Sequence, residues 1–267
     1  MKSKIDYIYG LRPVLEAIVS GKTIDRLIMK KGLKGSLYFQ LMQELKNHSI
    51  PYQFVPAEKL KSITQKNHQG IIAWLSEIEY HDISTLLPSI YESGRDPFLL
   101  ALNNISDVRN FGAIARSAEC FGVDCIIIPE KGAARINAEA VKTSAGALNK
   151  IPVARVKSIV KTLEFLKNSG LRIMSASEKG DNKIRSADLS GPSVLVMGSE
   201  DRGVSPEILK ITDIHLSIPT TGSIESLNVS VAAGILLYEI AGSREQGAGS
   251  REQGMINYNL RSEVSGR

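Results

Sequence analysis

From residue 97 onward, the sequence alternates regularly between short apolar runs and longer segments with helical spacing. Parallel strands need long crossover connections, which are usually helices, so this alternation predicts a mainly parallel sheet covered on both faces. Ligands of such sheets bind beyond the carboxyl ends of the strands. The expected strands are 98–102, 125–128, 151–156, 172–176, 193–197 and 216–218, and the expected helices begin near 111 and 137, span 159–167 and run from about 228 to 240.

The residues before this alternation predict a smaller α/β domain at 1–76, followed by a linker at 77–96 that carries a short helix. The larger α/β domain is then expected at 97–242. After this domain a seven-residue segment is repeated in tandem, since GSREQGA at 242–248 recurs as GSREQGM at 249–255. Two short polar copies are too small for a solenoid, so a disordered tail is predicted at 243–267. In the small domain the expected helices lie at 13–19 and around Leu37, Leu41 and Leu45, and the expected strands at 26–29, 52–55 and 70–75.

Composition limits the classes of function that fit. The chain has 267 residues, of which 43% are hydrophobic, as in an ordinary globular protein. Met1–Gly10 lacks an apolar signal core and no apolar run approaches the ~20 residues of a spanning helix, so we expect a cytoplasmic protein without a membrane partner. The net charge of +5 fits a polyanion, although charge alone is a weak signal. Cys120, Cys125 and the four histidines lack zinc-site spacing, so no metal is expected.

The loop that follows the first strand of the larger domain is richer in polar residues than a structural turn requires. It reads NNISDVRNFG from 103 to 112, and Arg116 follows nearly two turns into the expected helix. The predicted sheet-facing residues are Ala113, Ile114 and Ser117, which leaves the Arg116 guanidinium free to bind a phosphate with its planar fork of donors. The alternative makes Asn110 the helix cap and Arg116 part of a surface ion pair.

A second polar loop, MGSEDRG at 197–203, follows a buried strand. Gly198 would allow a ligand to approach the backbone closely, and Glu200 would accept hydrogen bonds from sugar hydroxyls or orient an arginine. The alternative is a plain turn before a helix capped at Ser205.

A third polar segment, IPTTGSIESLNVS at 218–230, leads into the last apolar helix. Only one polar residue is needed to cap a helix, so Ser226 and Asn228 are further candidate site residues. The amino end of the helix would also favour a carboxylate or a phosphate.

Several common ligand motifs are missing from the sequence. No G-x-G-x-x-G follows an expected strand, no G-x-x-x-x-G-K-[ST] occurs, and there is no G-x-S-x-G. Rossmann dinucleotide binding, P-loop nucleotide binding and the nucleophile elbow of hydrolases therefore lose support.

Taken in order, NFGAIARSA at 110–118, MGSEDRG at 197–203 and SLNVSVA at 226–232 resemble the three motifs of the SpoU family of RNA ribose 2'-O-methyltransferases, in the SPOUT or α/β-knot class. The resemblance covers about 97–241. The front domain is similar to the substrate-binding domain of the branch that modifies large-subunit ribosomal RNA, through IYG at 8–10 and HQGIIA at 68–73. Val108 departs from the proline that many relatives have there, and Asn103-Asn104 departs from a common acidic residue.

The resemblance implies a trefoil-knotted carboxyl-terminal domain that binds S-adenosylmethionine, and a homodimer that acts on RNA rather than DNA, most simply on large-subunit rRNA. The implied donor contacts are Met197, Gly198, Ile218, Leu227 and Asn228. The implied catalytic residues are Arg116, Asn110, Glu200, Ser226 and Asn228. An arginine normally stays protonated, so we expect Arg116 to bind the neighbouring phosphate rather than act as a free base.

The front domain supplies the candidate RNA contacts, for which a solvated basic face is the alternative. Its loop at 66–69 offers hydrogen-bond donors as well as charge. A tRNA methyltransferase and a non-catalytic RNA-binding or ribosome-assembly factor are the other two functions that the sequence leaves open. The candidate RNA contacts are Lys30, Lys31, Lys34, Lys59, Lys61, Lys66, His68 and, in the loop after 128, Arg135.

Overall fold

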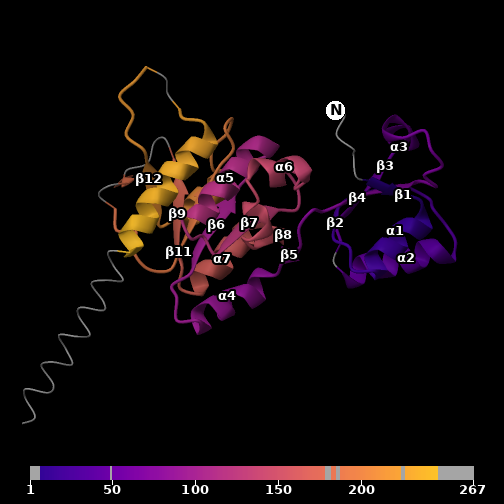
Figure 1. Cartoon of the computed structure of the whole chain (residues 1–267), viewed down its shortest axis with the longest axis horizontal. Coiled ribbons are helices and arrows are strands. Elements are labelled where there is room, and N and C mark those ends of the chain that lie inside the picture. The colour runs from indigo at the N-terminus through magenta and orange to yellow at the C-terminus, as the bar shows by residue number, and fades with distance from the viewer. Residues whose placement is uncertain (1–6, 49, 178–181, 185–186, 224–225, 246–267) are drawn as a thin grey trace, which may run out of the picture. The chain divides into compact units, whose positions relative to one another are not determined.

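The structure, a computed structural model, describes residues 7–48, 50–177, 182–184, 187–223 and 226–245. The chain divides into two compact units (Figure 1). The first comprises Met1–Glu79 with Arg135–Ala138, and the second Tyr80–Ala134 with Glu139–Arg267. Among the described helices, none is long and apolar enough to cross a membrane, and the described residues contain no group of three potential metal ligands.

The first unit is a four-stranded sheet in the order β1-β4-β2-β3, with helices on both faces. The strands β2 and β3 are parallel, and the other two pairs are antiparallel. Successive strand residues point to opposite faces, so Leu27 and Met29 pack against α1 and α2, whereas Ile28 packs beneath α3. The elements are β1 (Tyr7–Tyr9), α1 (Leu11–Val19), β2 (Ile24–Lys30), α2 (Ser36–Asn47), β3 (Tyr52–Val55), α3 (Ala57–Ile63) and β4 (Ile71–Leu75).

Two elements of this unit had no counterpart in the sequence-based expectation. The strand β1 is only three residues long, which is too short to show alternation. The helix α3 spans seven residues and buries only Leu60 completely, so it carries no apolar stripe. Both elements owe their formation to the neighbours they pack on.

The second unit contains an eight-stranded sheet in the order β10-β12-β9-β11-β6-β7-β8-β5, and every pairing is parallel. The prediction of a mainly parallel α/β sheet is therefore confirmed. Its elements are β5 (Tyr80–His81), α4 (Ile83–Glu92), β6 (Phe98–Leu102), α5 (Val108–Cys120), β7 (Cys125–Pro129), α6 (Ala138–Thr143), η1 (Ala147–Asn149), β8 (Val153–Val156), α7 (Ile159–Asn168), β9 (Arg172–Ala176), β10 (Asn182–Lys183), β11 (Ser193–Met197), α8 (Pro206–Ile211) and β12 (Ile214–Ser217), followed by a helix at 229–245.

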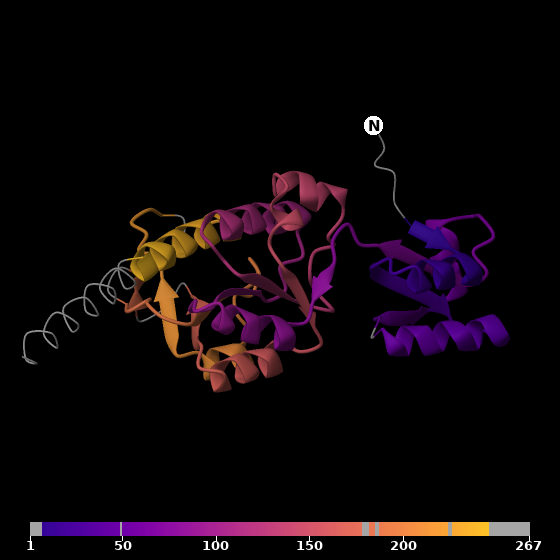
Figure 2. The same ribbon diagram turned by 60° about the horizontal axis from the view of Figure 1, so that its bottom comes forward.

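The helices cover both faces of this sheet (Figure 2). The helices α4, α7 and α8 share one apolar cluster with the strands. On the other face lie α5 and the helix of 229–245, whose Tyr238 ring centroid is 5.8 Å from that of Phe121. All residues of β6 and β11 are buried, which explains why these central strands read as continuous apolar runs.

The segment expected as a linker contributes two elements to the larger unit. The strand β5 pairs with β8 at the edge of the sheet. The helix α4 buries Ile83, Leu87 and Ile90 in the apolar cluster. The division between the two units therefore falls at Glu79.

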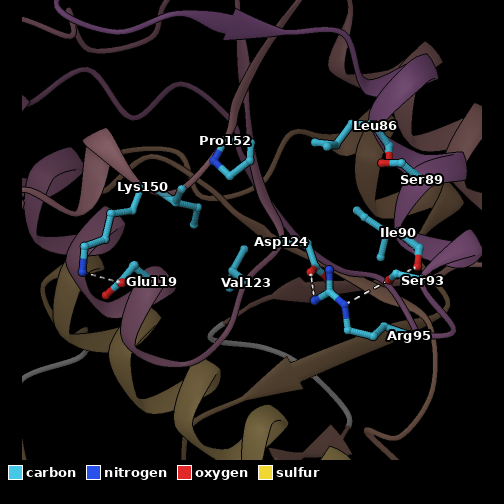
Figure 3. A pocket seen from close by; sticks show the side chains of 11 residues that line it. Leu86, Ser89, Ile90, Ser93, Arg95, Glu119, Val123, Asp124, Lys150 and Pro152 are labelled. Atoms are coloured by element: carbon cyan, nitrogen blue, oxygen red, sulfur yellow. Dashed lines mark hydrogen bonds and ion pairs between the residues drawn. The ribbon is translucent and has the colours of Figure 1, made fainter.

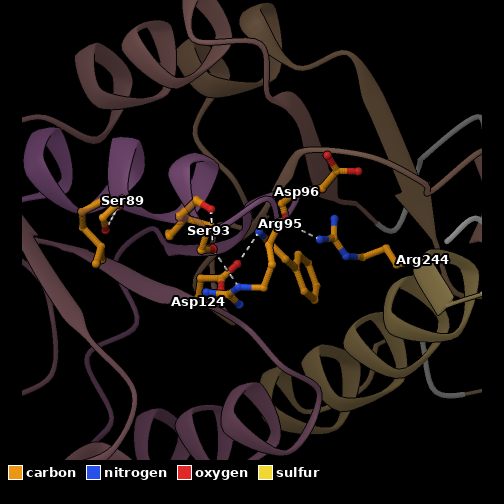
Figure 4. A network of polar contacts seen from close by, with 9 residues as sticks. Ser89, Ser93, Arg95, Asp96, Asp124 and Arg244 are labelled. Atoms are coloured by element: carbon orange, nitrogen blue, oxygen red, sulfur yellow. Dashed lines mark hydrogen bonds and ion pairs between the residues drawn. The ribbon is translucent and has the colours of Figure 1, made fainter.

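The end of the last described helix is fixed by Arg244 (Figure 4). Its guanidinium donates to the carbonyl oxygens of Gly191 and Asp96, each at 2.5 Å, and lies 5.1 Å from the ring centroid of Phe98. The helix therefore extends past residue 242, where the tail was expected to begin, because the first copy of the repeat supplies this anchoring arginine. Residues 246–267 of that tail lie outside the described part of the chain.

Candidate active site

The carboxyl ends of two neighbouring strands bring the first two polar loops together. The strands β6 and β11 are paired along their whole length, with Leu102 opposite Met197, and the Asn103 N–H donates to the Met197 carbonyl at 2.8 Å. The loop after β6 leads into α5, and the loop after β11 forms a tight turn. The site therefore begins where parallel sheets place their ligands.

The start of α5 differs from the expectation. Asp107 caps this helix, because its carboxylate accepts from the backbone N–H groups of Arg109 at 2.9 Å and Asn110 at 2.8 Å. Asn110 lies one turn inside the helix and is not the cap. Its side-chain amide is therefore available for contacts with the other loops.

Glu200 joins the three predicted loops through one carboxylate oxygen. Its Oε1 accepts from Asn110 Nδ2 at 2.9 Å and from Asn228 Nδ2 at 2.8 Å, and the Val229 N–H lies at 3.5 Å. Asn228 Nδ2 also lies 3.2 Å from Asn110 Oδ1. Three residues predicted from separate motifs thus form one hydrogen-bonded group, which we call the Asn–Glu–Asn cluster (Asn110, Glu200 and Asn228).

Ser230 determines which way the Asn228 amide points. Asn228 Oδ1 accepts from the Ser230 N–H at 2.9 Å and from Ser230 Oγ at 2.6 Å. The amide oxygen is occupied by these donors, so the NH₂ group must face Glu200. Ser230 was not among the predicted site residues, although the Asn-x-Ser spacing at the start of a helix is the signal of such a cap.

The tight turn after β11 explains why residue 198 is a glycine. The turn closes with the Gly203 N–H donating to the Ser199 carbonyl at 2.8 Å. A Cβ atom on Gly198 would lie 2.0 Å from the Gly203 carbonyl carbon and 2.2 Å from the Val204 nitrogen. The backbone of Gly203 and Val204 thus lies directly beside the Gly198 α-carbon, and this close packing shapes the turn that carries Glu200. A ligand contact at the Gly198 backbone stays a prediction.

The other predicted catalytic residues, Arg116 and Ser226, stand outside the Asn–Glu–Asn cluster. Both are exposed, and neither side chain makes a hydrogen bond or ion pair with another described residue. Arg116 lies six residues beyond Asn110, which is about 9 Å along a helix at roughly 1.5 Å per residue. The residues that α5 buries are Phe111, Gly112, Ile114, Ala115 and Ala118, so Ala113 and Ser117, which were expected to face the sheet, are only partly buried.

The remaining predicted donor contacts differ in exposure. The Met197 side chain is buried, Ile218 is half-buried just after β12, and Leu227 is 40% exposed. The backbone N–H groups of Ile218 and Leu227 donate to no other described residue.

A cavity of about 360 Å³ lies elsewhere in the larger unit (Figure 3). Its wall includes an ion pair of 2.6 Å between Arg95 and Asp124, residues that precede β6 and β7. It therefore opens at the amino ends of the strands and includes none of the motif residues. We assign the candidate site by the convergence of the motifs and not by this cavity.

In the first unit, the loop at 66–70 is held by its own side chains. His68 Nδ1 accepts from the Gly70 N–H at 3.0 Å, so the neutral ring carries its proton on Nε2 as an outward donor. Gln69 Oε1 accepts a hydrogen bond from the Leu11 N–H at 3.1 Å, so this oxygen already has a donor within the unit. The predicted lysines of this unit are all exposed, namely Lys30, Lys31, Lys34, Lys59, Lys61 and Lys66.

Arg135 groups with this first unit. Its guanidinium carbon lies 5.1 Å from the ring centroid of Trp74, and that of Arg26 lies 5.6 Å from the same centroid. Burial, followed by the charge of Arg135, lowers the pKa of Arg26. The excess of positive charge belongs to this part of the chain, because residues 1–79 contain 12 lysines and arginines against seven acidic residues, whereas residues 80–267 contain 21 of each.

Comparisons with known proteins show the family of this chain. Residues 97–238 match the SpoU rRNA Methylase family, and residues 7–81 match the family described as RNA 2'-O ribose methyltransferase substrate binding. The Bacillus subtilis protein YacO, assigned to the TrmH family of tRNA/rRNA methyltransferases, is 32% identical over 90% of this chain and 96% of its own.

Two solved structures show the same fold. The AdoMet-bound rRNA methyltransferase of Sinorhizobium meliloti has a TM-score of 0.56 at 24% identity and covers 88% of this chain and 86% of its own. The A. aeolicus TrmH/SpoU tRNA modifying enzyme has a TM-score of 0.53 at 31% identity and covers 61% of this chain and 86% of its own. With both family matches spanning the two units, the chain belongs to the SpoU family of RNA methyltransferases.

Proposed function

We propose that this chain transfers a methyl group from S-adenosylmethionine to a ribose 2'-hydroxyl of large-subunit ribosomal RNA. The observation that carries the proposal is the Asn–Glu–Asn cluster, which unites the three motif loops at the carboxyl ends of β6 and β11. The family match of residues 7–81 supports ribose as the acceptor.

The residues around the Asn–Glu–Asn cluster fit a methyl donor of this kind. The backbone N–H groups of Ile218 and Leu227, which have no partner among the described residues, suit the polar groups of a nucleoside. The exposed Leu227 side chain suits an aromatic base. The solved Sinorhizobium meliloti relative binds AdoMet. Bound there, S-adenosylmethionine supplies an electrophilic methyl group on a sulfonium.

The chain's own residues would then align the acceptor. In the transfer a carbon–sulfur bond breaks, a bond from carbon to the 2'-oxygen forms, and the hydroxyl proton leaves. Glu200 would accept from a ribose hydroxyl through the carboxylate oxygen that the two asparagines do not occupy. Arg116, exposed and without a partner among the described residues, would bind the neighbouring phosphate and stabilise the negative charge that develops on the 2'-oxygen, while the hydroxyl proton is lost to solvent. Ser226 would contact the ribose as well.

The share of this chain that each solved relative covers favours ribosomal RNA over transfer RNA as the substrate. The A. aeolicus tRNA modifying enzyme covers only 61% of this chain, whereas the Sinorhizobium meliloti rRNA methyltransferase covers 88%. This chain carries the basic first unit, which matches the substrate-binding family over residues 7–81. A second RNA-contacting unit suits a large, folded substrate.

The remaining expectations are part of the same proposal. They are a trefoil knot around 198–203 and 220–228, a homodimer and a cytoplasmic location. The position of β11 between β6 and β9, which both precede it in the chain, supports a threaded topology.

Tritium transfer from labelled S-adenosylmethionine tests the proposal. The acceptors are unmodified large-subunit rRNA, small-subunit rRNA and tRNA, and nuclease digestion maps the labelled nucleotide. We expect label on one ribose of the large-subunit RNA. Label confined to tRNA would overturn the substrate but keep the chemistry, and label in no RNA together with no calorimetric binding of the donor would favour a non-catalytic RNA-binding factor.

A further inference from the structure

Three aromatic rings form a row on one face of the four-stranded sheet of the first unit. The centroids of Tyr9 and Tyr7 are 6.2 Å apart, and those of Tyr7 and Trp74 are 6.1 Å apart. Tyr7 and Tyr9 alternate with Ile8 along β1, so both rings lie on the face opposite α1 and α2. Trp74 comes from the neighbouring strand, directly opposite Tyr7.

A cation lies at each end of this row. Lys66 Nζ is 5.8 Å from the Tyr9 ring centroid. At the other end, the guanidinium carbon of Arg26 is 5.6 Å from the Trp74 centroid, and that of Arg135 is 5.1 Å from it. Arg26 stands opposite Trp74 on β2, so the row crosses the three strands β1, β4 and β2. We call these five residues, Tyr7, Tyr9, Arg26, Lys66 and Trp74, the aromatic row.

The aromatic row is not simply the core beneath α3. Leu60 of that helix is fully buried against Ile28 and Ile72, whereas Tyr7 and Tyr9 remain only partly buried on the edge strand. Trp74 is 8% exposed and forms the floor of the row. Tyr7 and Tyr9 also pack against that cluster, but their partial exposure leaves part of each ring open to solvent beside a lysine. Partly exposed rings next to a cation suit a base and its phosphate together.

We propose that the aromatic row is a stacking platform for a single-stranded segment of the RNA substrate. Bases stack on the partly exposed rings of Tyr7 and Tyr9, and Lys66 and Arg26 bind the flanking phosphates. The chemistry favours single-stranded RNA because paired bases cannot present a face to a ring, and an aromatic-bearing four-stranded sheet is a known solution to that problem. The net charge of residues 1–79, which equals that of the whole chain, supplies the attraction for a polyanion. The inference rests on RNA being the substrate, as proposed above.

Trp74 is the chain's only tryptophan and therefore reports on this platform alone. Titration of the full chain with a twelve-nucleotide single-stranded RNA should change the Trp74 fluorescence, whereas a blunt RNA duplex of the same length should change it much less. Tyr9→Leu should weaken single-strand binding about tenfold or more, because one stacked base is lost. Tyr9→Phe should keep near-normal affinity.

Two further variants separate stacking from charge and from general damage. Lys66→Gln should weaken binding of all single strands and reduce the slope of log affinity against log salt by somewhat under one. Phe39→Leu is the matched control, because Phe39 is 69% exposed on α2, at the opposite face of the sheet. It should bind like the unaltered chain.

Equal affinity of Tyr9→Leu and the unaltered chain, or an equal fluorescence response to duplex and single strand, would overturn the proposal. Circular dichroism shows whether Tyr9→Leu is folded, and if it is not, Tyr7→Leu and Lys66→Gln decide the matter. Calorimetric binding of S-adenosylmethionine by the same variants is independent of this platform. A chain that binds S-adenosylmethionine but no single-stranded RNA at the platform would contradict this inference alone. A chain that binds single-stranded RNA at the platform but no S-adenosylmethionine would contradict the proposed function alone.

Discussion

Glu200 Oε1 accepts a hydrogen bond of 2.8 Å from Asn228 Nδ2, and the same oxygen accepts one of 2.9 Å from Asn110 Nδ2, 90 positions earlier in the chain. One carboxylate oxygen therefore holds the turn after β11, the helix α5 and the start of the last helix in register. None of these hydrogen bonds uses the second carboxylate oxygen, which the proposed mechanism assigns to a substrate hydroxyl. The following predictions address this arrangement and the packing around it.

Glu200→Gln should reduce methyl transfer by at least about tenfold, because a neutral amide accepts hydrogen bonds more weakly than a carboxylate. Its NH₂ group would also face the donors of Asn110 and Asn228. Glu207→Gln is the matched control, since Glu207 is an exposed residue in the first turn of α8. Initial rates of tritium transfer measure the effect. Equal rates for both variants would show that Glu200 has no role in methyl transfer.

Arg116→Lys should lower turnover about tenfold or more while leaving the affinity for S-adenosylmethionine unchanged, because lysine keeps the charge but lacks the planar fork. Arg109→Lys controls for the helix, since Arg109 is an exposed arginine of α5 that pairs with Glu139 at 3.4 Å. Single-turnover kinetics and calorimetry provide the two readouts. Near-normal turnover of Arg116→Lys would contradict a bidentate role at phosphate.

Gly198→Ala should destabilise the fold by about 1–3 kcal/mol or more, because the new Cβ would collide with backbone and not with a movable side chain. Gly242→Ala is the control, since a Cβ at that helical position meets nothing within 4 Å. Alanine there should be neutral or stabilise by up to about 1 kcal/mol. Thermal unfolding compares the two variants, and an unchanged midpoint for Gly198→Ala would contradict the tight turn.

The two cysteines should differ sharply in reactivity. Burial raises the pKa of the Cys125 thiol to about 12, so this group stays protonated and protected at pH 8, whereas Cys120 is exposed. Only the thiolate reacts with disulfide reagents. Ellman's reagent should therefore label one thiol rapidly in the folded chain and two in denaturant, and Cys120→Ser should abolish the rapid phase. Two rapid thiols in the folded chain would show that β7 is not buried as described.

The sequence by itself determined six of the eight strands of the larger sheet. The expected bounds of β6, β9 and β11 agree with the structure, because strands buried on both faces read as continuous apolar runs that need no knowledge of their neighbours. The three motif loops were also identifiable, since each follows a strand or precedes a helix with more polar residues than a turn or cap requires. Short elements such as β1 were not predictable, because three residues carry no periodicity.

Only the tertiary structure decided how the loops meet. No local pattern specifies that β11 lies between β6 and β9, and it is this order that brings Glu200 to Asn110. The structure also decided between the two interpretations of Asn110, because the Asp107 carboxylate caps α5 and leaves Asn110 for the Asn–Glu–Asn cluster. The sequence indicated that something approaches the backbone closely at Gly198. The structure shows that the backbone of Gly203 and Val204 lies where a Cβ atom of residue 198 would be. Strand order and the packing of one loop on another depend on contacts between residues distant in sequence, and these contacts exist only once the chain has folded.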